Sequence, residues 1–303
     1  MQHVAAPTAN ARGAHTLVPP AANAARPSAP ASGPIEVWDA SSGTEQLLTG
    51  VELTANADPV IATAIANAHK VDTFFRTTFG RNGWDNHGTP LRIVVHAPNE
   101  DGTPNMNNAY WDRARQRIFL GDGDGRVLAP LGGALDVMVH ETTHAIVDSS
   151  VNLRYSGQQG GINESWADVM GAVADPGNWL IGEDVFTPGT PGDAIRDLEH
   201  PIYTNLRELP TGTEIDPHDL ASLPGLAAVR VAQSLGRSEM GQIWYRALVE
   251  HLDSRAGFAG AARATLDAAA ELHGATSTEV GAVLQAWKSV GIDPRWKGAA
   301  TSS

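Results

Sequence analysis

The sequence contains no cysteine, no long apolar run and no block of basic residues. The lack of cysteine excludes disulfides, thiolate metal sites and a cysteine nucleophile, but it leaves the redox compartment open. No stretch approaches the roughly 18 consecutive apolar residues that a membrane-spanning helix requires. The formal net charge is −13, from 21 Lys and Arg against 34 Asp and Glu, which disfavours nucleic acid and anionic membranes as partners.

The remaining composition is that of a folded protein. A chain of 303 residues with 42% hydrophobic content can form one large domain or two of ordinary size. Residues 1–33 are different, because they are rich in Ala, Pro, Ser and Asn, and we predict a flexible leader or pro-segment there. This segment lacks the continuous apolar core of a secretory signal. We therefore expect export without a typical signal peptide or, alternatively, a cytoplasmic protein.

From residue 35 onward the apolar spacing predicts regular structure. Alternating residues predict strands at 35–40, 91–97 and 115–123, with a loop containing NMNNAYWD between the last two. Helical spacing predicts helices at 59–79, 134–148, 162–174, 225–235, 238–252, 257–273 and 277–290. Strand signals fade after the second of these helices. We therefore expect an α+β protein with a mixed lobe over 34–150 and a helical lobe over 151–303.

The segment VMVHETTHAIVD, residues 137–148, places two histidines four positions apart inside a predicted helix. Residues at this spacing lie one turn above each other, so His140 and His144 can direct their rings at one metal ion. Neutral imidazoles of this kind suit Zn²⁺, and Glu141 can accept a proton from the attacking water. Taken alone, the motif could also be a polar patch on an apolar helix.

A second segment, GINESWADVMG, supplies the context that favours a metal site. Its Glu164 follows His144 by twenty residues, and the segment is itself predicted to be helical. Glu164 can complete a two-histidine, one-carboxylate zinc site. Asp168 and Asn163 can hold the outer ring nitrogens of the ligand histidines, as neighbouring polar groups commonly do in zinc proteins.

HETTH followed by NESWAD resembles the thermolysin-like zinc metallopeptidases, whose pattern is HExxH and then NExxxD. The resemblance covers residues 34–292 and includes NNAYWD, GDGDG, IGEDVFTPG, GDAIRDL, IWYRAL and TSTEVGAVLQAW. The leader, Pro19-Pro20 and VWDASSGT resemble the protealysin branch, which carries a short pro-segment removed on maturation. The resemblance implies a two-lobed zincin with its active site between a mixed N-terminal lobe and a mainly α-helical C-terminal lobe.

The resemblance also implies the catalytic set. Zinc would be held by His140, His144 and Glu164, with Glu141 as general base. Tyr155, nine residues before Glu164, stands at the family's spacing for the tyrosine that hydrogen-bonds the developing oxyanion.

His218 falls where the family has its second oxyanion donor, and Asp216 or Asp219 would orient it. The family pattern there is GGVHxNSG, whereas this chain reads EIDPHDLASLPG. His200 is the alternative candidate for this role.

Substrate-binding residues follow from the same resemblance. Asn108 and the Ala109 carbonyl would pair with a substrate laid along the cleft as an added strand. Arg196 would bind the substrate carbonyl beyond the cut, although a structural ion pair is the alternative. The pocket beyond the scissile bond would be apolar and accept Leu, Phe, Ile or Val. Its lining residues would be Leu128, Leu131, Val137 and Ile195.

The family also holds calcium through carboxylates near the two zinc-binding helices. Asp136, Asp175 and Glu183 match those positions. Asn178 and Leu180 replace acidic residues of the family pattern, so we expect one structural Ca²⁺ and not a pair.

These observations predict a monomeric neutral zinc endopeptidase that cuts peptides or proteins on the amino side of large hydrophobic residues. The alternative is a zinc-bearing domain that binds peptides or a partner without turnover. A calcium-stabilised structural module is a third possibility, but it leaves HETTH without a role.

Overall fold

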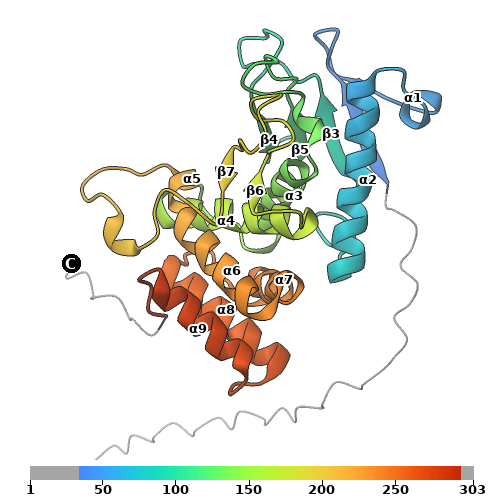
Figure 1. Ribbon diagram of the computed structural model, residues 1–303. Coiled ribbons are helices and arrows are strands. Elements are labelled where there is room, and N and C mark those ends of the chain that lie inside the picture. The colour runs from blue at the N-terminus through green and yellow to red at the C-terminus, as the bar shows by residue number, and fades with distance from the viewer. Residues whose placement is uncertain (1–33, 295–303) are drawn as a thin grey trace, which may run out of the picture.

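The computed structural model describes residues 34–294, which form a mixed lobe and a helical lobe (Figure 1). The mixed lobe contains β1 (Ile35–Asp39), β2 (Gln46–Leu47), α1 (Val51–Thr54), α2 (Pro59–Phe79), β3 (Leu91–Val95), β4 (Ala109–Asp112), β5 (Arg117–Leu120), the 3₁₀ turn η1 (Leu131–Gly133) and α3 (Leu135–Ser150). The helical lobe contains α4 (Gly157–Ala174), β6 (Leu180–Ile181), β7 (Arg196–Asp197), the 3₁₀ turn η2 (Leu206–Glu208), α5 (Pro217–Leu220), α6 (Ser222–Leu235), α7 (Arg237–Arg246), the π-helical turn η3 (Ala247–His251), α8 (Phe258–His273) and α9 (Thr278–Ser289). The expected α+β, two-lobed architecture is confirmed; the leader expected over residues 1–33 lies outside the described residues.

Five strands form one sheet in the order β2-β1-β3-β5-β4. Strands β1, β3 and β5 run parallel, whereas β4 pairs antiparallel with β5 and forms an edge. The loop that the local pattern predicts over NMNNAYWD is therefore wrong at its end, because Ala109–Asp112 is a strand, as the resemblance of NNAYWD to the family's edge-strand segment implied. Its main-chain pairing with β5, with Ala109 opposite Leu120, creates this strand. An edge strand leaves one row of backbone donors and acceptors unpaired.

Helix α2 has the bounds that the sequence predicts, because both ends carry strong local signals. The Asp58 side chain caps the first turn by accepting the N–H groups of Val60 and Ile61, and Pro59 occupies the first helical position. Gly80 ends the helix in the left-handed region at φ 71°, a conformation that glycine adopts at little cost.

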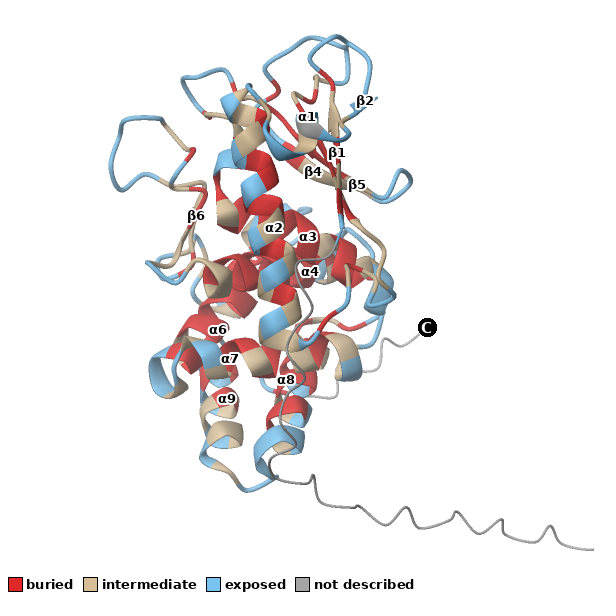
Figure 2. Ribbon diagram, turned by 90° about the vertical axis from the view of Figure 1, so that its right-hand side faces the viewer, coloured by how far each residue is buried: buried red, intermediate tan, exposed pale blue. Residues whose placement is uncertain are grey.

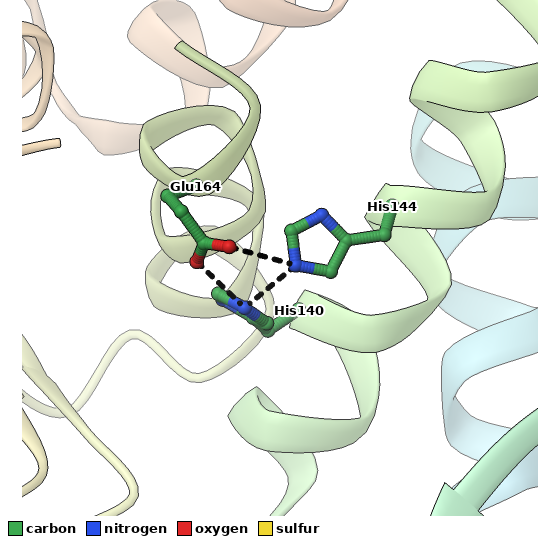
Figure 3. A group of neighbouring side chains, drawn as sticks. All are labelled: His140, His144 and Glu164. Carbon is green, nitrogen blue, oxygen red and sulfur yellow. Dashed lines mark hydrogen bonds and ion pairs between the residues drawn. The ribbon is translucent and has the colours of Figure 1, made fainter. Parts of the chain in front are cut away.

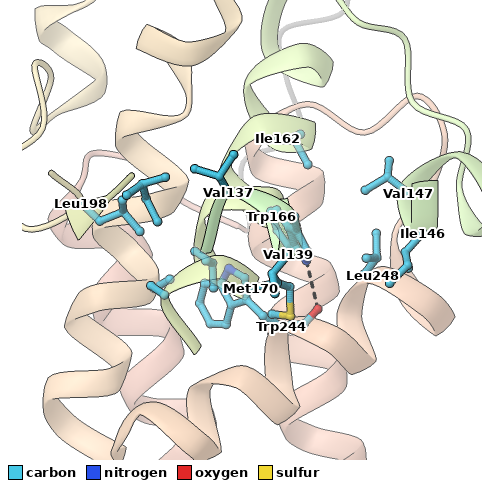
Figure 4. Packing of buried hydrophobic residues seen from close by; sticks show 14 of the residues in the cluster. Val137, Val139, Ile146, Val147, Ile162, Trp166, Met170, Leu198, Trp244 and Leu248 are labelled. Carbon is cyan, nitrogen blue, oxygen red and sulfur yellow. Dashed lines mark hydrogen bonds between the residues drawn. The ribbon is translucent and has the colours of Figure 1, made fainter. Parts of the chain in front are cut away.

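Helices α3 and α4 pass through the centre of the molecule. Figure 2 shows that both carry mostly buried residues, whereas α2 alternates between buried and exposed faces. Trp166 on α4 packs against Trp244 and donates its Nε1–H to the Trp244 carbonyl at 3.0 Å (Figure 4). Trp287 extends this layer by stacking on Trp244 and donating to Thr265 Oγ1 at 2.8 Å. Two helices buried in this way form a rigid platform for polar side chains.

The C-terminal half departs from the predicted run of helices in three places. Strands β6 and β7 pair as a two-stranded sheet, a four-residue helix α5 precedes α6, and the helix predicted over 238–252 ends in the π-helical turn η3. Within residues 34–294, no helix has the length and apolar character to cross a membrane.

Candidate metal centre and active-site cleft

Helices α3 and α4 bring three ligand atoms together at the junction of the lobes. His140 and His144 extend from α3, and Glu164 faces them from α4 (Figure 3). The two Nε2 atoms are 3.0 Å apart, and they lie 3.3 and 3.5 Å from the Glu164 oxygens. Among the described residues, these are the only three His or acidic side chains close enough to share one metal ion.

These distances fit a tetrahedral zinc ion. Bonds of about 2.0–2.1 Å to zinc place neighbouring ligand atoms about 3.3 Å apart. Glu164 Oε2 is buried and has no hydrogen-bond donor, and a cation would satisfy it. The side chain of Glu164 is fully buried, so the carboxylate has no water to compensate its charge.

The outer ring nitrogens of both histidines are held by residues of α4. His140 Nδ1 donates to Asp168 at 2.7 Å, and His144 Nδ1 donates to Asn163 Oδ1 at 2.8 Å. A neutral imidazole that donates from Nδ1 offers a lone pair at Nε2. Both Nε2 lone pairs are thereby directed at the same point, which is the arrangement a metal ion requires.

Ion pairs among Arg196, Asp168 and His140 determine the electrostatics next to the three ligand atoms. Arg196 binds Asp168 through two hydrogen bonds, from Nε at 2.7 Å and from Nη2 at 2.6 Å. Burial alone would raise the pKa of Asp168, but Arg196 and His140 hold this pKa at about 2. Burial alone would lower the pKa of His140, but Asp168 and Glu164 raise it to about 10. The Arg196–Asp168 pair therefore holds His140 in position from the side of the ring that faces away from the other ligand atoms.

Tyr155 and His218 both reach Glu164. The Tyr155 hydroxyl donates to Glu164 Oε1, and His218 Nε2 lies 3.3 Å from Glu164 Oε2. Burial and the neighbouring Glu164 carboxylate raise the pKa of Tyr155, so its phenol stays protonated and can donate. The imidazole of His218 is oriented by Asp216, whose Oδ1 lies 2.8 Å from Nδ1.

The alternative candidate, His200, is elsewhere. Its side chain is 78% exposed and pairs with Asp197 at 3.0 Å. The structure thus brings His218 to the metal ligands and leaves His200 on the surface.

Two glycines at the start of α4 let α5 approach closely enough to place His218. A Cβ atom at Gly161 would lie 2.5 Å from the Leu220 Cβ, and one at Gly160 would lie 3.0 Å from the Pro217 ring. Real Cβ atoms do not approach other atoms at 2.5 Å, so α5 would have to shift. The sequence contains this signal as Gly160-Gly161, but its purpose depends on the partner helix.

Two cavities extend from His140. A cavity of about 670 Å³ lies along β4 and the segment joining α3 to α4. It is lined by residues including Tyr110, Trp111, Glu141, Asn152 and Tyr155. A cavity of about 300 Å³ lies on the other side of His140 and is lined by all four predicted apolar pocket residues. These are Leu128, Leu131, Val137 and Ile195. Ile181 and Phe186 also line it; sequence reasoning missed both, because β6 and the following turn reach the pocket only through tertiary packing.

Asn108, Ala109 and Glu141 line both cavities, so they lie where the two meet. Asn108 precedes β4 and Ala109 begins it, at the open edge of the sheet. A peptide chain could hydrogen-bond to this edge as an additional strand while passing the metal ligands.

The predicted calcium ligands are not gathered as the zinc ligands are. Asp136 is buried, and its carboxylate accepts the N–H groups of Gly182 and Val137. Burial raises the pKa of Asp136 to about 6, and the charges of Glu183 and Asp175 add to this effect. Within the described residues, the three carboxylates do not come within sharing distance of one ion.

This combination defines the class: a zincin-type metallopeptidase, with HETTH on one helix, the glutamate on the next, and the site between a mixed and a helical lobe. Residues 29–148 match the family model described as thermolysin metallopeptidase, catalytic domain, and residues 151–292 match thermolysin metallopeptidase, alpha-helical domain. The chain belongs to the thermolysin metallopeptidase family.

Individual relatives agree with this assignment. The chain is 36% identical over 270 residues to an extracellular elastase of Staphylococcus epidermidis, covering 84% of this chain and 51% of the relative. It is 36% identical over 260 residues to neutral protease NprE of Bacillus pumilus, covering 82% and 83%. The solved protealysin precursor of Serratia proteamaculans superposes with a TM-score of 0.76 at 26% identity, covering 88% of this chain and 90% of that one. The chain spans about half the length of the first of these relatives.

Proposed function

We propose that this protein is a zinc-dependent neutral endopeptidase that cuts peptide bonds on the amino side of large hydrophobic residues. The observation that carries the proposal is the convergence of His140, His144 and Glu164 within 4.8 Å, with Glu141 lining both halves of the adjoining cleft. Zinc held by these three ligands would polarise the scissile carbonyl and acidify the attacking water.

The chain's own residues supply the remaining chemistry. Glu141 is a buried carboxylate at the junction of the two cavities, where it can take a proton from the attacking water and pass it to the leaving amine. Tyr155 and His218 offer an O–H and an N–H from the opposite lobe, and these donors would stabilise the oxyanion that forms from the carbonyl oxygen. The edge of β4 would hold the substrate backbone extended.

The smaller cavity supports the proposed specificity. Its apolar lining, together with a volume of about 300 Å³, suits one large aliphatic or aromatic side chain. Burying such a side chain contributes about 1.5–3 kcal/mol, enough to select the position of the cut.

The decisive test is the Glu141→Gln variant. We expect it to retain one equivalent of zinc and to lose cleavage of an unfolded protein, because it keeps the shape of the site but removes the base. Glu214→Gln removes an exposed carboxylate and serves as the matched control. Undiminished cleavage by Glu141→Gln would refute the mechanism. A wild-type protein that binds zinc and cuts no suitable peptide would instead be a binding domain without turnover.

We further propose one structural calcium ion near Asp136. The mutual repulsion of Asp136, Glu183 and Asp175 supports it, because a divalent cation would relieve that repulsion. We expect millimolar calcium to raise the melting temperature of wild type and to leave that of Asp136→Asn nearly unchanged. An equal response in the two proteins would exclude this site.

We also propose that the enzyme is exported and matures by loss of the segment before about residue 33. The family membership and the extracellular relative support export. Mass spectrometry of the purified protein left to mature would report the true N-terminus, and its metal content would be measured on the same sample. A stable, uncut chain with full activity would argue against a pro-segment.

A further inference from the structure

Two arginines, Arg113 and Arg154, line the larger cavity, and they come from different parts of the chain. Arg113 follows β4 directly, and Arg154 lies in the segment joining α3 to α4. We propose that these arginines select an acidic side chain in the substrate, two to four residues before the cut. This proposal rests on the proposed endopeptidase function and specifies its substrate.

Both guanidinium groups can still bind a carboxylate of the substrate. Within residues 34–294, Arg154 forms no ion pair with another side chain, and Arg113 reaches only Asp148, at 3.9 Å. The same Asp148 oxygen accepts the Trp111 Nε1–H at 2.8 Å, so Asp148 is already engaged. The other acidic residues lining this cavity, Glu141 and Glu164, stand at the zinc site.

The direction of the substrate follows from the two cavities and from β4. Asn108 and Ala109 line both cavities, whereas Tyr110, Trp111 and Arg113 line only the larger one. If the residue after the cut occupies the apolar pocket, the residues before it extend past Trp111 towards Arg113. Such a substrate runs antiparallel to β4. At about 3.3 Å per residue in an extended strand, Arg113 lies roughly four positions beyond Ala109, which places its partner two to four residues before the cut.

The end of the cleft with Arg113 and Arg154 differs in charge from the apolar cavity. In the apolar cavity the one basic side chain besides histidine is Arg196, and Asp168 already binds it through two hydrogen bonds. The whole chain has a formal net charge of −13, so its general field repels acidic peptides. Two exposed arginines at one end of the cleft, one of them only loosely paired with Asp148, would reverse that repulsion locally and discriminate between substrates by charge.

The test compares peptides that differ in one residue. A fluorogenic peptide with Leu after the cut would carry Glu, Gln or Lys at each of the second, third and fourth positions before it. Exposed ion pairs are individually weak, because water and salt screen both charges. We therefore expect kcat/KM for the best Glu peptide to exceed that of its Gln counterpart about threefold to tenfold at low salt, and the Lys peptide to be the poorest. The preference should shrink at 0.5 M NaCl, where the Debye length falls below roughly 5 Å.

The variants assign the effect to these side chains. In the Arg113→Gln/Arg154→Gln double variant, the ratio of Glu to Gln rates should fall to about one. Arg115→Gln is the matched control, because Arg115 stands two residues from Arg113 but outside the cavity and pairs with Asp112. Its ratio should stay at the wild-type value.

Equal rates for Glu and Gln peptides at all three positions in wild type would overturn the proposal, and so would a preference that persists in the double variant. Failure of wild type to cut any peptide in the series, neutral ones included, would count against the endopeptidase function itself. The two failures are therefore distinguishable.

Discussion

Asp168 accepts the Nδ1–H of His140 at 2.7 Å while both of its oxygens are bound by Arg196. The carboxylate therefore connects a zinc-ligand candidate on α3 to a side chain of β7, and it is nearly completely buried. A chain of charge-assisted hydrogen bonds in a buried environment fixes the orientation of each member. The direction of the His140 lone pair thus depends on residues that never touch the metal.

Removing this charge should weaken metal binding. We expect Asp168→Asn to lower zinc affinity about 10- to 100-fold, as loss of such a supporting carboxylate typically does. Competition with a chromogenic chelator would measure it. Asp267→Asn, an exposed position on α8, is the control and should bind zinc as wild type does. Unchanged affinity in Asp168→Asn would mean that packing alone holds His140.

Loss of either proposed oxyanion donor should reduce turnover but not metal binding. We expect Tyr155→Phe and His218→Gln each to lower kcat about 10²- to 10³-fold with little change in KM, because these donors act on the charge that develops in the transition state. Steady-state kinetics with zinc analysis of the same samples would test this. Tyr203→Phe, a half-buried tyrosine outside both cavities, is the control. A larger change in KM than in kcat would assign these residues to ground-state binding.

The close packing of α5 on α4 leads to a prediction about a residue that does not touch the reacting groups. Gly161→Ala forces a new Cβ against Leu220, so α5 and its His218 must move. We expect kcat to fall at least tenfold while zinc content stays at one equivalent. Gly281→Ala on α9 adds the same methyl group into open space and should leave kcat unchanged. Full activity in Gly161→Ala would show that α5 can adjust without loss of function.

The His96 site predicts a dependence of stability on pH. His96 Nδ1 lies 2.8 Å from Asp122, and its Nε2 lies 3.4 Å from Asp58, the residue that caps α2. Burial alone would lower the pKa of His96, but Asp122, Asp58 and Asp39 together raise it above its ordinary value. The pairing therefore stabilises the fold fully below about pH 6.5, the unfolded pKa, and is lost as the pH rises through the higher folded pKa.

We expect the free energy of unfolding of wild type, relative to His96→Asn, to decrease between pH 6 and pH 9. Asn is the suitable replacement because His96 adopts φ +56° and asparagine tolerates that region. Urea denaturation at several pH values would measure the difference. A constant difference across this range would show that the pKa of His96 is the same in the folded and the unfolded protein.

Much of the fold is predictable wherever local signals and burial agree. Helix α2 has Asp58, Pro59 and Gly80 at its ends, so its bounds follow from the sequence alone. The two histidine ligands are equally predictable from the sequence, because residues four positions apart lie on the same face of any helix. Glu164 approaches the two histidines only because α4 packs on α3. The resemblance implied this packing, whereas the spacing of residues in the sequence could not predict it.

Other features depend on distant partners. Strand β4 forms because its backbone pairs with β5. The strands β6 and β7 have only two residues each, which is too short to show an alternating pattern. The position of His218 depends on α5, which the unusual segment EIDPHDL forms with Asp216 as its cap. Ile181 and Phe186 reach the apolar pocket from such segments, so no local pattern marks them.

For the proposed endopeptidase, the open edge of β4 would also determine which conformations of a target can be attacked. A segment that joins this edge must present its own backbone N–H and C=O groups, and a helix or an interior strand has already used them. Cleavage sites in native proteins should therefore map to frayed ends and irregular surface loops. A folded target resists for as long as its local structure persists, and its susceptibility becomes a measure of how often that structure opens.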